Sequence, residues 1–490
     1  MAASGPPVVG CRSLEAVWQG LSPQWLGGDR ARTAAWLRAV EDRRQQLAGL
    51  RAAPSLVLLA EAEPADFSAG FWAALLAGWD VAIANPHWGQ QEWRSVRQHL
   101  CPAVIWGEAA APSQAWLSKS AADELNSIGP AGQTKPAILI PTGGSSGQVK
   151  FVRHHWQSLM AAVDGFCQFF QPEGRPVNVC CVLPVYHVSG LMQLLRVWTS
   201  GGEAVIMPFK QLVNGSFSTG EDRFISLVPT QLEQLIQAGK GPWLTSFQAV
   251  LLGGAPAWPA LLNRAADLRI PLCLSYGMTE TAAMVTALSP QDFLQGDRSS
   301  GRALPHATIQ IDKQIVETES LIERSESARP GVGQIVVHIE AFSEPVHTDD
   351  LGYLSADGRL HITGRVSSKI ISGGENIFPA EVEAALRNTG QVKDVCVVGW
   401  PHPKWGEVVT ALYVPASSEV CPESLRQALL LPHPNKATPA LSRYKLPKQW
   451  VRLPALPQNA QGKLNRRELL KLQIQSSRQA QAAGDDGGYC

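Results

Sequence analysis

Short apolar runs alternate with helix-like segments in the middle of the chain. Turn residues or polar residues bound each run, and apolar residues recur with helical spacing near Leu191, Leu232 and Leu261. We expect strands at residues 177–183, 203–208, 223–228, 247–254 and 270–276. Because strands that alternate with helices are typical of a parallel, doubly wound α/β sheet, the pattern predicts that fold class here.

The hydrophobic pattern changes after about Gly301. The candidate strands become shorter, at residues 309–316, 334–340 and 359–364, and a turn signal at Asp357-Gly358 separates two of them. This indicates a small antiparallel β subdomain. Past Gly364, Pro379 opens a predicted helix at 380–388, and two apolar strands follow at 392–400 and 408–414. We expect a compact α+β domain there, with a surface loop at 432–439 and a disordered tail at 472–490.

Composition excludes several classes of protein. The 490 residues include 42 Lys and Arg and 42 Asp and Glu, so no net charge attracts nucleic acid or anionic lipid. No apolar run is long enough to cross a bilayer, and no basic segment followed by an apolar run opens the chain. We expect a cytoplasmic protein without membrane insertion or bound nucleic acid. The nine cysteines lack metal-ligand spacing, and we interpret them as reduced thiols that mostly fill the core.

The segment from Thr142 to Lys150 follows the apolar run 137–141 and combines three glycines with hydroxyl side chains and a lysine. Glycines let the backbone approach an anion closely, and hydroxyls, free N–H groups and an ammonium can donate to phosphate oxygens. The GK[ST] ending of a Walker A loop is absent. One interpretation is a phosphate-binding loop, and the other is a flexible surface loop.

A second segment, residues 276–281, lies where a doubly wound sheet binds its ligands, directly after a strand. Tyr276 can stack on a base, and Thr279 with Glu280 can offer oxygens to Mg²⁺. A turn followed by a capped helix is the other interpretation. A third segment, 252–256, also ends a predicted strand, and a tight turn explains it equally well.

Taken in this order, these segments resemble the adenylate-forming superfamily of acyl-CoA synthetases, adenylation domains and luciferases. The resemblance continues downstream. Residues 347–353 are similar to the superfamily's TGDLG segment, residues 362–365 with 371–381 to its hinge and following loop, and residues 459–464 to its C-terminal lysine motif.

The resemblance implies a role for each segment. The residues expected to bind ATP are Thr142, Gly143, Gly144, Ser145, Ser146, Gly147, Lys150, Gly253, Gly254, Ala255, Tyr276, Gly277, Met278, Thr279, Asp350 and Arg365. Tyr276 would stack on adenine, Asp350 would accept the ribose hydroxyls, and Glu280 with Thr279 would serve Mg²⁺. Lys463 would reach the carboxylate and α-phosphate during adenylation, where a mobile cation suits a charge-rich transition state. The residues expected near CoA are Ser372, Gly373 and Gly374.

Two departures from the superfamily pattern affect details. Val149 replaces a usual proline in the phosphate loop, and Gly143 and Ser146 replace serine and threonine. At the hinge, Ser367 and Ser368 replace an acidic pair, so only context places the pivot between the two domain orientations.

The segment 183–196 bears on which acid is used. His187, a second candidate catalytic residue, follows a strand at the mouth of the sheet and could stack near the acyl group or simply pack with a hydrogen bond. Ser189 and Gly190 follow it directly. Arg196 is the only charge in an apolar stretch, and it could bind a second substrate carboxylate or point to solvent. This segment resembles the o-succinylbenzoate:CoA ligases of menaquinone and phylloquinone synthesis, which act on a keto-diacid.

We therefore expect an α/β enzyme with an adenylation core at 1–365 and a mobile C-terminal domain at 366–471. Its substrates would be a small-molecule acid, ATP and coenzyme A, with Mg²⁺ as cofactor. Two alternatives stay open, namely a ligase for another aryl or medium-chain acid and a stand-alone adenylation domain that loads a carrier protein. A catalytically dead homologue is disfavoured, because Lys463, Glu280 and Asp350 are all present. The sequence does not give the oligomeric state.

Overall fold

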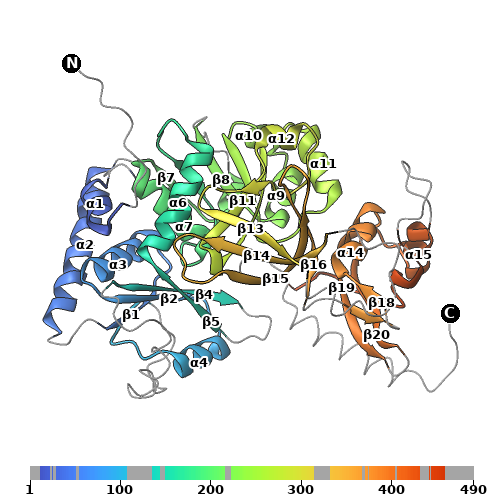
Figure 1. The fold of residues 1–490 in the computed structure, drawn as a ribbon, viewed down its shortest axis with the longest axis horizontal. Helices are drawn as coiled ribbons and strands as arrows, with labels where there is room; N and C mark the ends of the chain where they lie inside the picture. Colours follow the sequence, from blue (N-terminus) through green and yellow to red (C-terminus); the bar gives the residue numbers. More distant parts are fainter. Residues whose placement is uncertain are drawn as a thin grey trace.

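The structure is a computed structural model in which four β-sheets follow one another along the chain (Figure 1). The described residues are 12–21, 25, 29–50, 55–107, 135–143, 149–215, 222–313, 331–366, 370–372, 375–402, 405–430, 441 and 443–457. Within them no helix is both long and apolar enough to span a membrane. The predicted loop at 432–439 and the predicted tail lie outside these residues.

The first sheet has the strand order β3-β1-β2-β4-β5. Its strands are β1 (Leu56–Ala60), β2 (Asp80–Ile83), β3 (Val104–Gly107), β4 (Ala137–Gly143) and β5 (Val149–His155). The helices of this part are α1 (Leu14–Gln19), α2 (Arg30–Gly49), α3 (Pro64–Leu76) and α4 (Gln90–His99). Strands β1 to β4 run parallel, whereas β5 turns back along β4. Every residue of β1 is buried, as expected for a parallel strand covered on both faces.

The second sheet has the order β12-β11-β10-β9-β8-β6-β7. Its strands are β6 (Asn178–Cys181), β7 (Ala204–Ile206), β8 (Arg223–Leu227), β9 (Ala249–Leu252), β10 (Leu272–Met278), β11 (Ala283–Ala287) and β12 (Arg302–Ala303). The helices are α6 (Trp156–Phe170), α7 (Val188–Ser200), α8 (Phe209–Asn214), α9 (Pro229–Gln237), α10 (Gly241–Leu244), α11 (Pro259–Asp267) and α12 (Pro290–Leu294). Strands β6 to β10 are parallel, and α7, α9 and α11 occupy the three predicted helical stretches, so the doubly wound prediction is confirmed.

The third sheet is antiparallel, as predicted, with the order β13-β14-β15-β16. Its strands are β13 (Ala307–Asp312), β14 (Gly333–Ile339), β15 (Val346–Leu354) and β16 (Leu360–Arg365).

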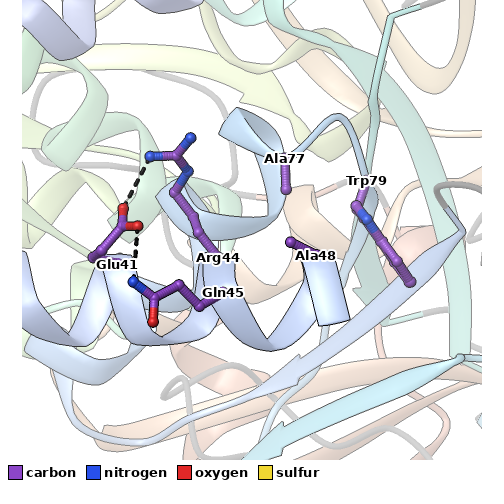
Figure 2. Close-up of a pocket in the computed structure, with 6 residues that line it drawn as sticks. All are labelled: Glu41, Arg44, Gln45, Ala48, Ala77 and Trp79. Atoms are coloured by element: carbon purple, nitrogen blue, oxygen red, sulfur yellow. Dashed lines mark hydrogen bonds and ion pairs between the residues drawn. The ribbon is translucent and has the colours of Figure 1, made fainter. Parts of the chain in front are cut away.

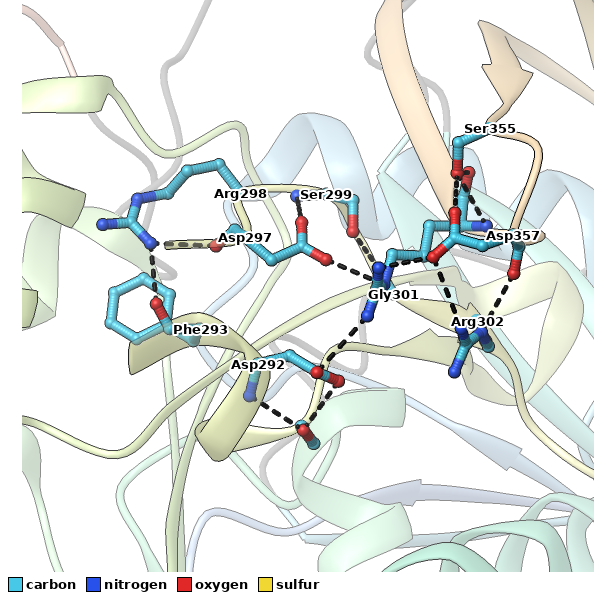
Figure 3. Close-up of polar contacts among 11 residues, drawn as sticks. Asp292, Phe293, Asp297, Arg298, Ser299, Gly301, Arg302, Ser355 and Asp357 are labelled. Atoms are coloured by element: carbon cyan, nitrogen blue, oxygen red, sulfur yellow. Dashed lines mark hydrogen bonds and ion pairs between the residues drawn. The ribbon is translucent and has the colours of Figure 1, made fainter. Parts of the chain in front are cut away.

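Ion pairs and backbone bonds attach the third sheet to the second. Arg359 pairs with Asp292 and Asp297 near α12 and with Asp357 in the β15–β16 turn. Figure 3 labels these three aspartates. The Ser300 N–H also donates to the Leu360 carbonyl oxygen at 2.8 Å, and the Leu360 N–H donates to the Gly301 carbonyl oxygen at 2.8 Å. These contacts fix β15, which carries Asp350, relative to the sheet that carries Tyr276.

The fourth sheet forms a separate α+β unit at the far end of the ribbon from α1 and α2 (Figure 1). Its order is β18-β17-β20-β19, with β21 beside β20. The elements are β17 (Ile370–Ser372), β18 (Glu375–Ile377), α14 (Pro379–Asn388), β19 (Val392–His402), β20 (Gly406–Pro415), α15 (Pro422–Leu430) and β21 (Gln449–Arg452). It has an apolar core of its own that includes Val382, Val397 and Leu425.

Candidate active site

The second and third predicted segments meet at one edge of the second sheet. Leu252 at the end of β9 pairs with Leu274 in the parallel strand β10, so Gly253 lies beside Ser275. Gly254 and Ala255, which follow β9, therefore lie at the same edge as Tyr276 near the end of β10. In an open α/β sheet this carboxyl edge is where ligands bind.

The ends of the predicted phosphate loop pair with each other in the β4–β5 hairpin. Thr142 is the partner of Lys150, and Gly143 is the partner of Val149. Thr142 is half-buried and the Lys150 side chain is exposed. Residues 144–148, with the predicted ligands Gly144, Ser145, Ser146 and Gly147, lie outside the described residues. Strand β4 runs next to the 3₁₀ turn Thr279–Thr281, so the hairpin and the predicted magnesium segment are neighbours.

His154 joins these two segments and was missed by sequence reasoning. Its Nε2–H donates to the carbonyl oxygen of Thr279 at 2.8 Å, while Nδ1 lies 3.4 Å from the Ser158 hydroxyl. Burial lowers the pKa of His154 to about 4, so the ring is neutral at pH 7 and this hydrogen bond fixes its tautomer. The histidine thus holds the turn that carries Thr279 and Glu280 against β5.

Tyr276, Asp350 and Arg365 form one hydrogen-bonded group. The Tyr276 hydroxyl donates to Oδ2 of Asp350 at 2.8 Å, and the Arg365 Nε–H donates to Oδ1 at 2.8 Å. Asp350 is 6% exposed, and the pKa of Tyr276 is raised by burial and by the neighbouring carboxylate charge. Arg365 is the register partner of Asp350 across β15 and β16. The three predicted nucleotide ligands are therefore adjacent.

The turn after Tyr276 is shaped by a close approach of two strands. A Cβ on Gly277 would lie 1.8 Å from the carbonyl oxygen of Ala283, so only glycine fits there. The β10–β11 pairing shifts at this point, and Met278 then leads into the turn Thr279–Thr281.

Glu280 is half-exposed, and its carboxylate has no hydrogen bond or ion pair within the described part of the chain. Among the described residues no group of three His, Cys, Asp or Glu side chains could enclose a metal ion. A single free carboxylate beside a threonine hydroxyl suits Mg²⁺, which is usually held by one or two carboxylates together with substrate phosphates.

The predicted acid-binding residues lie on one helix. His187 is the N-cap of α7, half-exposed and in edge contact with the Tyr186 ring at 5.0 Å. Gly190 is buried within the first turn. Ser189, Gln193 and Arg196 follow at the i, i+4 and i+7 positions, so they share one face of the helix. Gln193 is 1% exposed and its side-chain carbonyl has no partner in the described structure, so this face is both polar and buried.

Arg196 is buried rather than solvent-exposed, with 4% of its surface accessible. Its guanidinium carbon lies 3.9 Å from the centre of the Phe166 ring on α6. Burial lowers the pKa of Arg196 to about 10, and the thiols of Cys167 and Cys273 are the groups that oppose this shift. No carboxylate among the described residues pairs with this cation.

The remaining predicted residues lie in the C-terminal unit. Ser372, at the end of β17, is 5% exposed and its hydroxyl has no hydrogen-bond partner within the described residues. Gly373, Gly374 and Lys463 lie outside the described residues, as do Ser367 and Ser368.

A surface pocket on the N-terminal part contains none of the predicted ligands. It is lined by Glu41, Arg44, Gln45, Ala48, Ala77 and Trp79 (Figure 2). Glu41 accepts hydrogen bonds from Arg44 at 3.0 Å and from Gln45 at 3.3 Å. Because the pocket's own side chains satisfy this carboxylate, we do not assign it a ligand.

Two family models match the chain. The AMP-binding enzyme family matches residues 45–337, and the AMP-binding enzyme C-terminal domain matches residues 381–463. The chain is 31% identical to a 2-succinylbenzoate–CoA ligase of Listeria monocytogenes over 348 residues, which cover 69% of this chain and 70% of that protein. It is 33% identical to a 2-succinylbenzoate–CoA ligase of Bacillus anthracis, over 68% of this chain and 69% of that protein.

Solved structures give a consistent picture. The o-succinylbenzoate CoA synthetase of Bacillus subtilis, in complex with the acyl-adenylate intermediate OSB-AMP, superposes with a TM-score of 0.69 at 25% identity. The match covers 89% of this chain and 92% of that structure. An ATP-bound MatB from Rhodopseudomonas palustris shares the fold, with a TM-score of 0.68 at 20% identity over 90% of this chain and 93% of that structure.

Proposed function

Because the chain belongs to the AMP-binding enzyme family, we propose that it is an ATP-dependent 2-succinylbenzoate:CoA ligase. The acid and ATP form an acyl-adenylate and pyrophosphate, and coenzyme A then displaces AMP to give the thioester. The observation that carries the choice of acid is Arg196, a buried cation with no carboxylate partner among the described residues. 2-Succinylbenzoate has two carboxylates, so one can react while the other pairs with this arginine.

The arrangement at the sheet edge supports a division of labour for ATP. The hairpin from Thr142 to Lys150 holds the phosphates, and the Tyr276 ring contacts adenine. Asp350 has about four acceptor positions as a carboxylate, of which Tyr276 and Arg365 occupy two, so two remain for the ribose hydroxyls. Glu280 and Thr279 would hold Mg²⁺, which would supply positive charge to neutralise the phosphates.

The two half-reactions need two arrangements of one site. We place the core at 1–365 and the mobile domain at 366–471, so that the pivot lies between Arg365 and Ser368. In one orientation Lys463 reaches the reacting carboxylate, and in the other Ser372 to Gly374 face coenzyme A.

The test follows thioester formation from 2-succinylbenzoate, ATP, Mg²⁺ and coenzyme A by mass spectrometry. Two monoacid analogues, 4-oxo-4-phenylbutanoate and 2-propanoylbenzoate, each lack one carboxylate and show which one reacts. We expect Arg196→Ala to reduce kcat/KM for the diacid by roughly 30- to 1000-fold, as for truncating one partner of a buried charge pair. The analogue that keeps the reacting carboxylate should be a poor substrate of the native enzyme, and Arg196→Ala should lower its kcat/KM little further.

The matched control is Arg298→Ala, because Arg298 also stacks on a phenylalanine, at 4.4 Å from the Phe293 ring centre, but is solvent-exposed in the loop after α12 (Figure 3). This control should leave kcat/KM unchanged. Equal losses for diacid and monoacid in Arg196→Ala would remove the arginine from acid recognition. A native enzyme that forms thioesters only from other acids would refute the proposed substrate.

A further inference from the structure

His306 is another buried polar side chain without a hydrogen-bond partner among the described residues, and it lies close to Arg196. Both ring nitrogens of His306 and the Nε atom of Arg196 are buried without a hydrogen-bond partner in the described structure. Buried polar atoms are paired in the great majority of cases, with protein or with ordered water. Three unpaired nitrogen atoms on two neighbouring side chains therefore indicate that a ligand or water molecule forms the missing hydrogen bonds.

Helix α6 brings the two side chains together. The Arg196 guanidinium rests on the ring of Phe166, and the His306 ring lies against Gly165, the preceding residue. A Cβ on Gly165 would be 2.0 Å from Nδ1 of His306, which shows how tightly the imidazole is seated. The Arg196 charge also acts on His306, since burial first and this charge second lower the pKa of His306 to about 4.

The backbone places His306 next to strand β11, between the second and the third sheet. Leu304 donates a backbone hydrogen bond of 2.8 Å to the Val285 carbonyl oxygen in β11, and the Ala307 N–H donates to the Leu304 carbonyl oxygen at 2.9 Å, so His306 lies in the turn that leads into β13. Strand β11 in turn contacts α6 and α7, the helices that carry Gly165 and Arg196.

We propose that His306 is a second specificity-determining residue, which donates an N–H hydrogen bond to the non-reacting carboxylate that Arg196 pairs with. This proposal rests on the proposed function and extends it. A carboxylate can accept from two directions, so a guanidinium on one side and an imidazole N–H on the other satisfy it together. An acid with an apolar tail would leave all these atoms buried and unpaired, which disfavours it.

The first variants are His306→Ala and His306→Gln, assayed with 2-succinylbenzoate and with the reactive monoacid analogue. Loss of a hydrogen bond to a charged group predicts a decrease in kcat/KM for the diacid of roughly 10- to 100-fold, mainly through KM. The monoacid should change by less than about threefold, because it lacks the carboxylate that the bond serves. Glutamine keeps an amide donor and should restore part of the loss. His338→Ala is the matched control, because His338 lies on β14, is exposed and hydrogen-bonds to Gln310.

Gly165→Ala displaces the imidazole without changing it chemically. Alanine is favoured over glycine inside a helix, so a loss of diacid selectivity in this variant would come from the clash with His306. In the His306→Ala background the clash is removed, and Gly165→Ala should cause no further loss. Such non-additivity is a result that a general packing defect would not give.

The outcomes separate the two proposals. If the native enzyme uses the diacid but His306→Ala loses activity equally for diacid and monoacid, or not at all, the role of His306 is refuted and the proposed function stands. If the native enzyme makes no thioester from the diacid, the proposed function fails and this inference fails with it.

Discussion

Asp350→Asn tests the nucleotide site with the least disturbance of the fold. The side chain keeps its size, and an asparagine oxygen can still accept from the buried Tyr276 hydroxyl. The ion pair with Arg365 is lost, but the Arg365 side chain is 58% exposed, so its contribution to stability is small. The variant removes the negative charge of the carboxylate, whose two remaining acceptor positions we propose for the ribose hydroxyls.

The expected effect is on ATP binding. Hydrogen bonds to a charged group contribute roughly 1.5 to 3 kcal/mol, so losing the charge predicts ATP affinity about 10- to 150-fold weaker. Isothermal titration calorimetry with ATP and, separately, with the acid measures both affinities. The acid should bind nearly as before, because Asp350 pairs with Tyr276 and Arg365 rather than with the α7 residues.

Asp349→Asn is the neighbouring control, since Asp349 precedes Asp350 in β15 but is exposed. It should bind ATP like the native protein. A folded Asp350→Asn protein, judged by circular dichroism and thermal melting, that binds ATP within twofold of native would refute a ribose contact at this carboxylate.

Two further predictions concern His154 and Lys463. The folded pKa of His154 lies below the unfolded value, so the stability it contributes is complete above about pH 6.5 and is lost as pH falls through about 4. That loss is worth up to about 3 kcal/mol. Urea unfolding at pH 7 and pH 4.5 measures the free energy of unfolding at each pH, and the difference between the two should be smaller for His154→Gln, which keeps a donor for the Thr279 carbonyl. The same difference in native and variant protein would show that His154 does not cause the pH dependence. Lys463→Ala should nearly abolish acyl-adenylate formation while sparing thioester formation from supplied acyl-adenylate, as followed by pyrophosphate release and mass spectrometry, and equal loss in both steps would argue against domain alternation.

The sequence predicted the second sheet well because its strands are short apolar runs with helices between them. The same pattern predicted where the candidate site lies. Parallel strands end at one edge of a sheet, so the segments after Leu252 and Leu274 had to be neighbours. The first sheet was not predicted as such, although β1 reads LVLLA and is fully buried. A five-residue apolar run does not by itself distinguish a buried strand from part of a helix.

The side-chain contacts that complete the site were beyond sequence reasoning. His154 and Thr279 are 125 positions apart, and their hydrogen bond depends on how β5 lies against the turn after β10. For Tyr276 the sequence predicted only that its ring stacks on a base. In the structure its hydroxyl also hydrogen-bonds to Asp350, which is 74 positions away in the sequence. His306 follows a short strand with no motif around it, so nothing in the pattern distinguished it from a surface histidine.

The region around Arg196 combines three features that each oppose stability. The buried Arg196 guanidinium has no carboxylate partner in the part of the chain that the structure describes, so it keeps a desolvation cost that the Phe166 ring offsets only in part. The imidazole of His306 has no hydrogen-bond partner among the described residues, and Gly165 weakens the interior of α6 so that the imidazole can fit. An apolar side chain at each position would be more stable, because unpaired polar groups and a helical glycine would all disappear. Neighbouring residues that each lower the stability of the fold are typical of a binding site whose ligand supplies the missing contacts. A carboxylate accepts hydrogen bonds from a guanidinium and an imidazole N–H at the same time, so it suits this site.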